Sequence, residues 1–188
     1  MKIKFLCLFL LGLAIASCKE NASTETQDVD QETEVAMEDT EEDPILLGLE
    51  KRNTLESEPY LQWFEESYKN HSIDSATIAQ VKPMLLETDI TIFMGTWCED
   101  SQRETPAFYK ILDQAGYNSD NVRLITVSED KDTPQGLEEG KNITNVPTII
   151  FYKNGEELGR IVEYPLESLE KDMAKILKGE AYKHAYAE

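Results

Sequence analysis

One short stretch limits the possible folds of this chain more than any other. Residues 90–94 read Ile-Thr-Ile-Phe-Met and predict a buried strand from Asp89 to Met94. Residues 95–101 follow as Gly-Thr-Trp-Cys-Glu-Asp-Ser, and a helix is predicted from Cys98 to Ala115, ended by Gly116. This strand–turn–helix unit, with a cysteine where the turn meets the helix, is the first part of the predicted fold.

The chain after residue 121 predicts three more strands and a closing helix. The strands are expected at residues 122–127, 147–152 and 157–162, and the last two are joined by a turn whose Asn-Gly pair favours a hairpin. A polar connection with at most one helical turn is expected at 134–142, and an amphipathic helix at 166–177. This order predicts an α/β fold, with a mixed central sheet and helices on both of its faces.

Residues 44–85 predict a partly helical N-terminal extension. Residues 45–49 fit either an edge strand or a packed loop, and the pattern does not decide between them. A helix should open at residues 58–64, where three aromatic side chains share one side, and we favour core packing over an aromatic binding face. A second helix is predicted at 75–86, which Pro83 either kinks or ends.

The first 18 residues predict export to a bacterial cell envelope. Two lysines precede an apolar run at residues 5–15, as in a signal peptide covering residues 1–17. The following Ile-Ala-Ser-Cys sequence at 15–18 resembles the bacterial lipobox, which implies cleavage before Cys18 and a lipid anchor on that residue. The alternative is an ordinary signal peptide with an accidental Cys18. Lys19 weakly favours the outer membrane, because the familiar sorting rule for inner-membrane retention places Asp there.

Charge indicates a tether and excludes one class of partner. Residues 19–43 hold eleven acidic residues against Lys19 alone and have no aromatic residue, so residues 18–43 are expected to be a lipidated, disordered acidic tether. Residues 44–188 still hold 26 acidic against 15 basic residues, and the formal net charge of the whole chain is −19. Nucleic acid is therefore an unexpected partner, because phosphate binding needs clustered Lys and Arg.

The three cysteines reduce to one candidate nucleophile. Cys7 leaves with the signal peptide and Cys18 carries lipid, so Cys98 is the free thiol of the predicted mature chain. At the start of a helix, unpaired backbone N–H groups and the helix dipole favour a thiolate, which is the attacking form in disulfide exchange.

Neighbours of Cys98 modify this expectation. Ser101, three residues on, faces the same side of the helix and can donate its hydroxyl hydrogen to the thiolate, but it cannot form a disulfide. Glu99 and Asp100 disfavour a neighbouring thiolate, and Arg103 partly compensates, so the balance stays open. Trp97 would shield the site and offer a flat apolar wall to a substrate.

These residues resemble the thioredoxin family. Trp97-Cys98-Glu-Asp-Ser101 is similar to its active-site motif except at the second cysteine, and Pro106 matches the proline of its active-site helix. Asn145-Val146-Pro147-Thr148 resembles the family's cis-proline loop, and residues 148–162 resemble the strands that follow it. The resemblance covers residues 86–178 and leaves 179–188 as a C-terminal tail.

The resemblance implies a thioredoxin-like fold with a cis Pro147 facing Cys98, and a Val146 backbone that binds an extended substrate. Two departures matter, since Ser101 replaces the second cysteine and Ile92 stands where the family often buries an acid. Both weaken the case for rapid disulfide reduction.

Two functions remain open at this point. The leading hypothesis is a monothiol thiol–disulfide exchanger acting on protein or small-molecule thiols and disulfides, and the alternative is a redox-inactive module that binds extended polypeptide segments. A third hypothesis is that Cys98 is a redox sensor, oxidised and then capped by a small thiol. No cofactor is expected, and no metal either, because the two histidines, His71 and His184, lie in unrelated segments.

Overall fold

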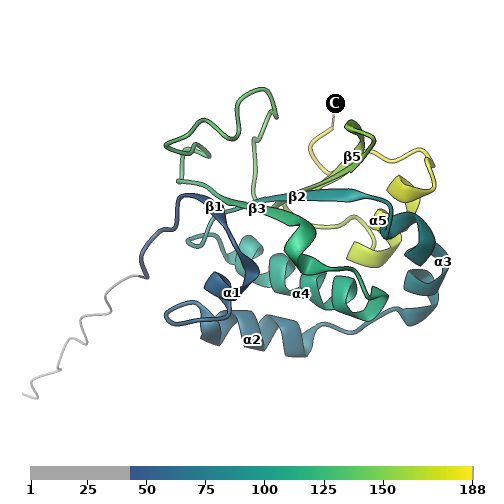
Figure 1. The fold of residues 1–188 in the computed structure, drawn as a ribbon, viewed down its shortest axis with the longest axis horizontal. Coiled ribbons are helices and arrows are strands. Elements are labelled where there is room, and N and C mark those ends of the chain that lie inside the picture. The colour runs from purple at the N-terminus through teal and green to yellow at the C-terminus, as the bar shows by residue number, and fades with distance from the viewer. Residues whose placement is uncertain (1–42, 188) are drawn as a thin grey trace, which may run out of the picture. The chain divides into compact units, whose positions relative to one another are not determined.

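A five-stranded sheet is the centre of residues 43–187, the part of the chain that the computed structural model describes (Figure 1). Its strand order is β1-β3-β2-β4-β5, in which β2 and β3 run parallel and the other neighbours run antiparallel. The predicted α/β fold with a mixed sheet flanked by helices is confirmed. The elements are β1 Gly48–Glu50, α1 Arg52–Leu55, α2 Leu61–Asn70, α3 Ser75–Leu85, β2 Asp89–Met94, α4 Glu99–Ala115, a 3-10 turn η1 Ser119–Asn121, β3 Val122–Thr126, β4 Thr148–Lys153, β5 Glu156–Val162 and α5 Leu169–Leu177.

The strand–turn–helix unit forms as predicted. β2 covers the predicted residues, and α4 begins directly after Cys98, which is its N-cap. Gly116 ends α4 in the left-handed conformation at φ 72°, which glycine adopts without a steric penalty. Pro106 lies inside α4, so the resemblance to the kinked active-site helix extends to this residue.

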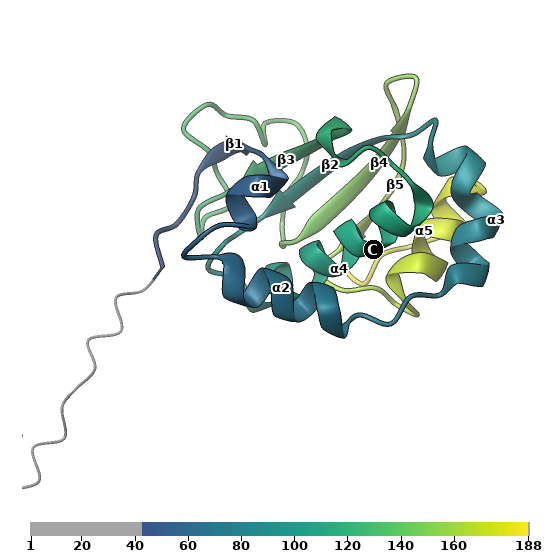
Figure 2. The ribbon, with the colours of Figure 1, turned by 60° about the horizontal axis from the view of Figure 1, so that its bottom comes forward.

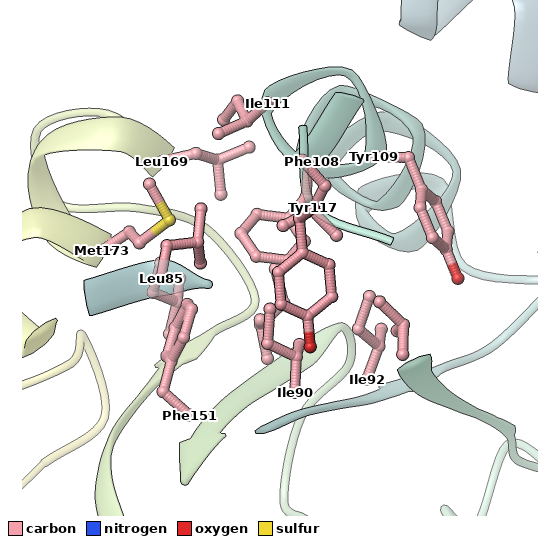
Figure 3. Close-up of a cluster of buried hydrophobic side chains, with 14 of the residues drawn as sticks. Leu85, Ile90, Ile92, Phe108, Tyr109, Ile111, Tyr117, Phe151, Leu169 and Met173 are labelled. Atoms are coloured by element: carbon pink, nitrogen blue, oxygen red, sulfur yellow. The ribbon is translucent and has the colours of Figure 1, made fainter. Parts of the chain in front are cut away.

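The helices gather on one face of the sheet (Figures 1 and 2). All five contribute side chains to the larger core, which also takes Ile90, Ile92 and Met94 from alternate positions of β2. Figure 3 shows this core, in which the rings of Phe108 and Phe151 meet edge to face with 5.9 Å between their centroids. These buried apolar side chains attach the helical layer to the sheet.

The prediction of helices on both faces is wrong for the described residues. The second face carries a smaller core that includes Phe93 and Ile125, and the loop between β3 and β4 covers it with Leu137 and Ile143. The polar connection predicted at 134–142 forms turns and no helix. Four positions in this loop have positive φ, between 53° and 71°, which interrupts any helix: Lys131, Gly136, Gly140 and Asn142.

The N-terminal extension packs into the fold. Its first segment is an edge strand, because Gly48–Glu50 pairs antiparallel with β3. Helix α2 starts at Leu61, after a cis Glu58–Pro59 peptide. Core packing, as favoured from the sequence, holds for Phe64, which is 3% exposed, while Trp63 is partly buried and packs against the core. In α3 the Asp74 side chain caps the N-terminus, and Pro83 lies within the helix without ending it.

The last helix and the tail are held by buried carboxylates. Helix α5 begins at Leu169, three residues later than predicted, because Ser168 caps it by accepting the Lys171 N–H. Asp172 is fully buried and accepts the Tyr182 hydroxyl at 3.1 Å, which ties the C-terminal tail to α5.

Part of the sequence-based prediction lies beyond this structure. The predicted signal peptide, the lipidated Cys18 and all of the tether except Asp43 fall outside the described residues. Within residues 43–187, no helix combines the length and apolar character needed to cross a membrane.

Candidate functional site

The turn between β2 and α4 places the candidate nucleophile. The Cys98 N–H donates to the Gly95 carbonyl at 3.1 Å, and the Cys98 carbonyl accepts the Gln102 N–H at 2.9 Å, which starts the helix. Cys98 has extended backbone angles, as an N-cap residue should, and its side chain makes no capping bond. Its sulfur therefore lies at the N-terminus of a 17-residue helix, where backbone N–H groups and the helix dipole favour negative charge.

The sheet brings a distant loop to the sulfur. Strands β2 and β4 are antiparallel neighbours, with Phe93 opposite Thr148, so the turn that follows β2 meets the loop that precedes β4. The Val146–Pro147 peptide in that loop is cis, and the Cys98 thiol donates to the Val146 carbonyl at 3.2 Å. Cys98 is half-buried and packs against the smaller core, of which Val146 is a member.

Ser101 has a different partner from the one expected. Its side chain is fully buried, and its oxygen accepts the Gly95 N–H at 3.2 Å. The expected bond to Cys98 is not among the hydrogen bonds of residues 43–187. Because the bond to Gly95 uses only a lone pair of the Ser101 oxygen, the hydroxyl hydrogen of Ser101 is still available as a donor. Its role toward a thiolate stays a prediction.

Trp97 is fixed on three sides. Its indole N–H donates to the Val127 carbonyl at 3.0 Å, and the Lys131 ammonium lies 5.6 Å from its ring centroid. A Cβ at Gly95 would lie 2.4 Å from the ring, so the close packing of Trp97 needs a glycine there. Trp97 therefore forms a rigid, half-buried wall beside the sulfur. Lys131 was missed, because no motif in the sequence indicates that its loop folds over this ring.

The acidic residues after Cys98 are unequally compensated. The Arg103 guanidinium pairs with Asp100 and also with Glu104, at 2.8 Å from the second carboxylate. Glu99 is exposed and makes no ion pair with any other residue in the described part of the chain. The compensation expected from Arg103 therefore reaches Asp100 but leaves Glu99 as a net negative charge next to the nucleophile.

Hydrogen bonds from the N-terminal extension stabilise the turn that carries Cys98, a contact that the sequence analysis missed. The hydroxyl of Thr96 accepts the Leu46 N–H at 3.2 Å, and the Gln102 side chain donates to the Thr96 carbonyl at 2.7 Å. The Tyr60 hydroxyl donates to the Pro44 carbonyl at 2.7 Å and holds that segment in place. Leu46 and Thr96 lie 50 positions apart along the chain, and Tyr60 and Pro44 lie 16 apart, so only the folded structure reveals these contacts.

A second buried contact joins the extension to the last helix. His71 Nε2 lies 3.0 Å from Glu170 Oε1, and Glu170 is 1% exposed. Burial raises the pKa of Glu170, but the hydrogen bonds from His71 and from the Asp74 N–H outweigh it and hold the pKa below its usual value. Among residues 43–187, no three His, Cys, Asp or Glu side chains gather as a metal site would require.

Comparison with known proteins agrees with this geometry. Residues 65–175 match the family model described as Thioredoxin. "Thioredoxin-2" of Saccharomyces cerevisiae is 33% identical over 70 residues, which are 37% of this chain and 62% of that protein. A thioredoxin of Echinococcus granulosus is 34% identical over 70 residues, 37% of this chain and 60% of its own length. The chain thus spans about three-fifths of the length of these curated relatives.

A solved structure, the oxidised mitochondrial thioredoxin 3 of Saccharomyces cerevisiae, aligns with a TM-score of 0.31 and 20% identity, over 51% of this chain and 86% of that one. The family model covers more than half of the present sequence and includes both the Cys98 turn and the Val146–Pro147 loop. The chain belongs to the thioredoxin family.

Proposed function

We propose that this protein is a monothiol thiol–disulfide exchanger that acts through Cys98. The observation that carries the proposal is the position of the sulfur, half-exposed at the N-terminus of α4 and 3.2 Å from the carbonyl that precedes the cis proline. The thioredoxin relatives support a redox function of this general kind.

The exchange takes two steps. The Cys98 thiolate attacks one sulfur of a substrate disulfide, so that a mixed disulfide forms and the other substrate sulfur leaves as a thiolate that takes up a proton. Ser101 cannot attack the mixed disulfide, because a hydroxyl does not replace the missing thiol. A thiol from another molecule must attack the substrate sulfur, which releases Cys98 as a thiolate and leaves that thiol in a disulfide with the substrate. Attack at the Cys98 sulfur instead releases the substrate as a thiolate and leaves the attacking thiol in a disulfide with Cys98, which a second thiol must then reduce.

The residues around the sulfur suit an extended polypeptide. The backbone of Val146 lies beside Cys98 in the loop that precedes β4, where we expect a substrate strand to pair with it, and Pro147 fixes the direction of that backbone. The rigid wall of Trp97 limits the approach to the sulfur. Protein disulfides and small-molecule disulfides or thiols are the proposed partners.

The lipid anchor belongs to the same proposal. The lipobox-like sequence ending at Cys18 would place the protein in a bacterial cell envelope, and the acidic tether would hold the domain away from the membrane. Incorporation of labelled fatty acid in a bacterial host should occur in the full chain and be lost in Cys18→Ser. Equal labelling of both would refute the anchor without affecting the exchange chemistry.

Trapping tests the exchange. The full chain, with Cys7→Ser and Cys18→Ser so that Cys98 is the sole thiol, is mixed with an unfolded protein that keeps one disulfide. We expect a covalent adduct that persists until a small thiol is added and that is absent in Cys98→Ser. Binding without an adduct, and unchanged by Cys98→Ser, would refute the exchanger and support the binding module.

A further inference from the structure

A groove with a volume of about 510 Å³ lies between α2 and the first half of α4. Figure 2 shows these two helices side by side on the helical face of the sheet. Trp63, Glu66 and Asn70 recur at helical spacing on the α2 wall, and Glu99 and Gln102 do so on the α4 wall. The N-terminal extension therefore builds one side of a groove whose other side belongs to the helix that begins at the nucleophile.

The groove opens beside the candidate active site. Glu99, in its wall, is the residue directly after Cys98. Gln102, also in its wall, donates its backbone N–H to the Cys98 carbonyl at 2.9 Å. The groove and the nucleophile therefore share the first turn of α4, and the residues next to a substrate cysteine are the ones that we expect to reach the groove.

The charges of the groove favour a cation. Arg103 is its one Lys or Arg, and that guanidinium already serves both Asp100 and Glu104. Glu66 lines the α2 wall and Glu99 lines the α4 wall, both are exposed, and neither makes an ion pair within residues 43–187. The groove therefore has an excess of negative charge at the two walls that no side chain of the described protein neutralises.

The aromatic residue of the groove suits a long cationic side chain. Trp63 is half-buried and presents part of its ring system to the groove. Lys and Arg side chains pack their aliphatic stems on apolar surface and keep the charged head near carboxylates or over an aromatic face. Two carboxylates and an aromatic wall form such an arrangement here.

We propose that this groove is a specificity subsite that binds a Lys or Arg side chain close to the disulfide cysteine of a protein substrate. The proposal rests on the proposed exchange at Cys98 and names the substrates that the exchange prefers. A cation held between Glu66 and Glu99 also offsets the repulsion between Glu99 and the negative charge on sulfur during the exchange. Residues 61–71 of the extension then have a function as well as a structural role.

Matched peptides test the substrate preference. Each carries one cysteine in a disulfide with a thionitrobenzoate group and, two residues away, either Lys or Gln. The full chain with Cys7→Ser and Cys18→Ser attacks the peptide sulfur, and the released chromophore reports the rate. We expect the Lys peptide to react about three to ten times faster at low salt, with the ratio approaching one at high salt. Equal rates at low salt would overturn the subsite.

Variants of two neighbouring glutamates distinguish an effect of the groove from an effect of the protein's overall negative charge. Glu66→Gln removes a carboxylate of the groove and should lower the Lys-to-Gln rate ratio about threefold. Glu65→Gln removes an equal charge from the same helix, but Glu65 lies outside the groove and pairs with Lys69. The ratio should keep its wild-type value in this control. An equal fall in both variants would assign the preference to net charge and overturn the subsite.

A binding measurement keeps the two proposals distinguishable. Fluorescently labelled versions of the peptides, with serine in place of cysteine, report affinity by anisotropy and need no reaction at Cys98. A Lys preference in binding that Glu66→Gln reduces would support the subsite even if no chromophore is released, which would refute only the exchanger. Chromophore release without any Lys preference in rate or binding would refute only the subsite.

Discussion

Replacing His71 with alanine should weaken the attachment of the N-terminal extension to the thioredoxin-like core. His71 is the C-cap of α2, and its ring meets the buried carboxylate of Glu170 on α5 at 3.0 Å. In the His71→Ala variant, the side chain of Glu170 keeps the Asp74 N–H at 3.2 Å as its remaining partner from another residue. The carboxylate stays buried, and the variant leaves it less well compensated.

The expected loss of stability follows from burial. A hydrogen bond to a charged group contributes about 1.5–3 kcal/mol, and breaking a fully buried pair costs about 3–5 kcal/mol. The side chain of His71 is 19% exposed, so water replaces part of the lost contact. We therefore expect a loss of about 2 kcal/mol in the free energy of unfolding, which for a domain of this size lowers Tm by about 4–8 °C.

Urea unfolding of the full chain at pH 7, followed by circular dichroism, measures this loss. Lys69→Ala is the matched control, because Lys69 lies two residues away and pairs with Glu65 in solvent, so its removal should cost less than about 0.5 kcal/mol. Adding Glu170→Gln to His71→Ala should restore part of the stability by removing the buried charge. A loss in His71→Ala no greater than in the control would refute the buried-pair reasoning.

Three further predictions concern the site and the same carboxylate. Gly95→Ala should displace the Trp97 ring and cost about 1–3 kcal/mol, seen as a lower urea midpoint and changed tryptophan fluorescence; an unchanged midpoint would contradict the packing at 2.4 Å. Ser101→Ala should leave the buried Gly95 N–H without its acceptor and cost about 1–3 kcal/mol in the same assay, whereas a neutral effect would mean that the bond matters little. Because the folded-state pKa of Glu170 lies below the unfolded value of about 4.3, its contribution is complete above about pH 5 and is lost as pH falls through the folded-state pKa. The stability gap between wild type and Glu170→Gln should narrow from pH 6 to pH 3, and a gap that is constant or widens would contradict this.

The sequence predicts best where local signals agree. An apolar run gives β2, a glycine in the left-handed conformation ends α4, and an Asn-Gly turn joins β4 to β5 at positions 154–155. Each of these signals lies within a few residues of the element it predicts, so no tertiary information is needed. The position of Cys98 at the start of a long helix is also predicted from such local signals.

The arrangement of layers needed the folded structure. The connection between β3 and β4 is polar and has no hydrophobic period, so the order of elements alone, and no local signal, led to the prediction of helices on both faces. Positive φ at Lys131 and Asn142, which are not glycines, cannot be read from residue type alone. Those turns leave the second face to a loop, with Leu137 and Ile143 as its apolar contacts.

In the candidate site, too, the sequence predicts some residues but not their contacts. The contact between Cys98 and Val146 spans 48 positions, and no periodicity predicts it, so it entered only through the family resemblance. The groove beside Cys98 needed the packing of α2 on α4, and the hydrogen bond from Gly95 to Ser101 needed the exact path of the turn. Residue types could nominate Cys98 and Ser101, but their partners depend on tertiary contacts.

The central claim is that Cys98 exchanges with a disulfide in the native protein. The most direct measurement mixes the full chain, with Cys7→Ser and Cys18→Ser, with 5,5′-dithiobis(2-nitrobenzoate) and follows both chromophore release and intact mass. The account predicts release of one chromophore per native chain, an adduct that stays on Cys98, and its complete removal by an added thiol. Release only after the protein unfolds in urea would contradict the account.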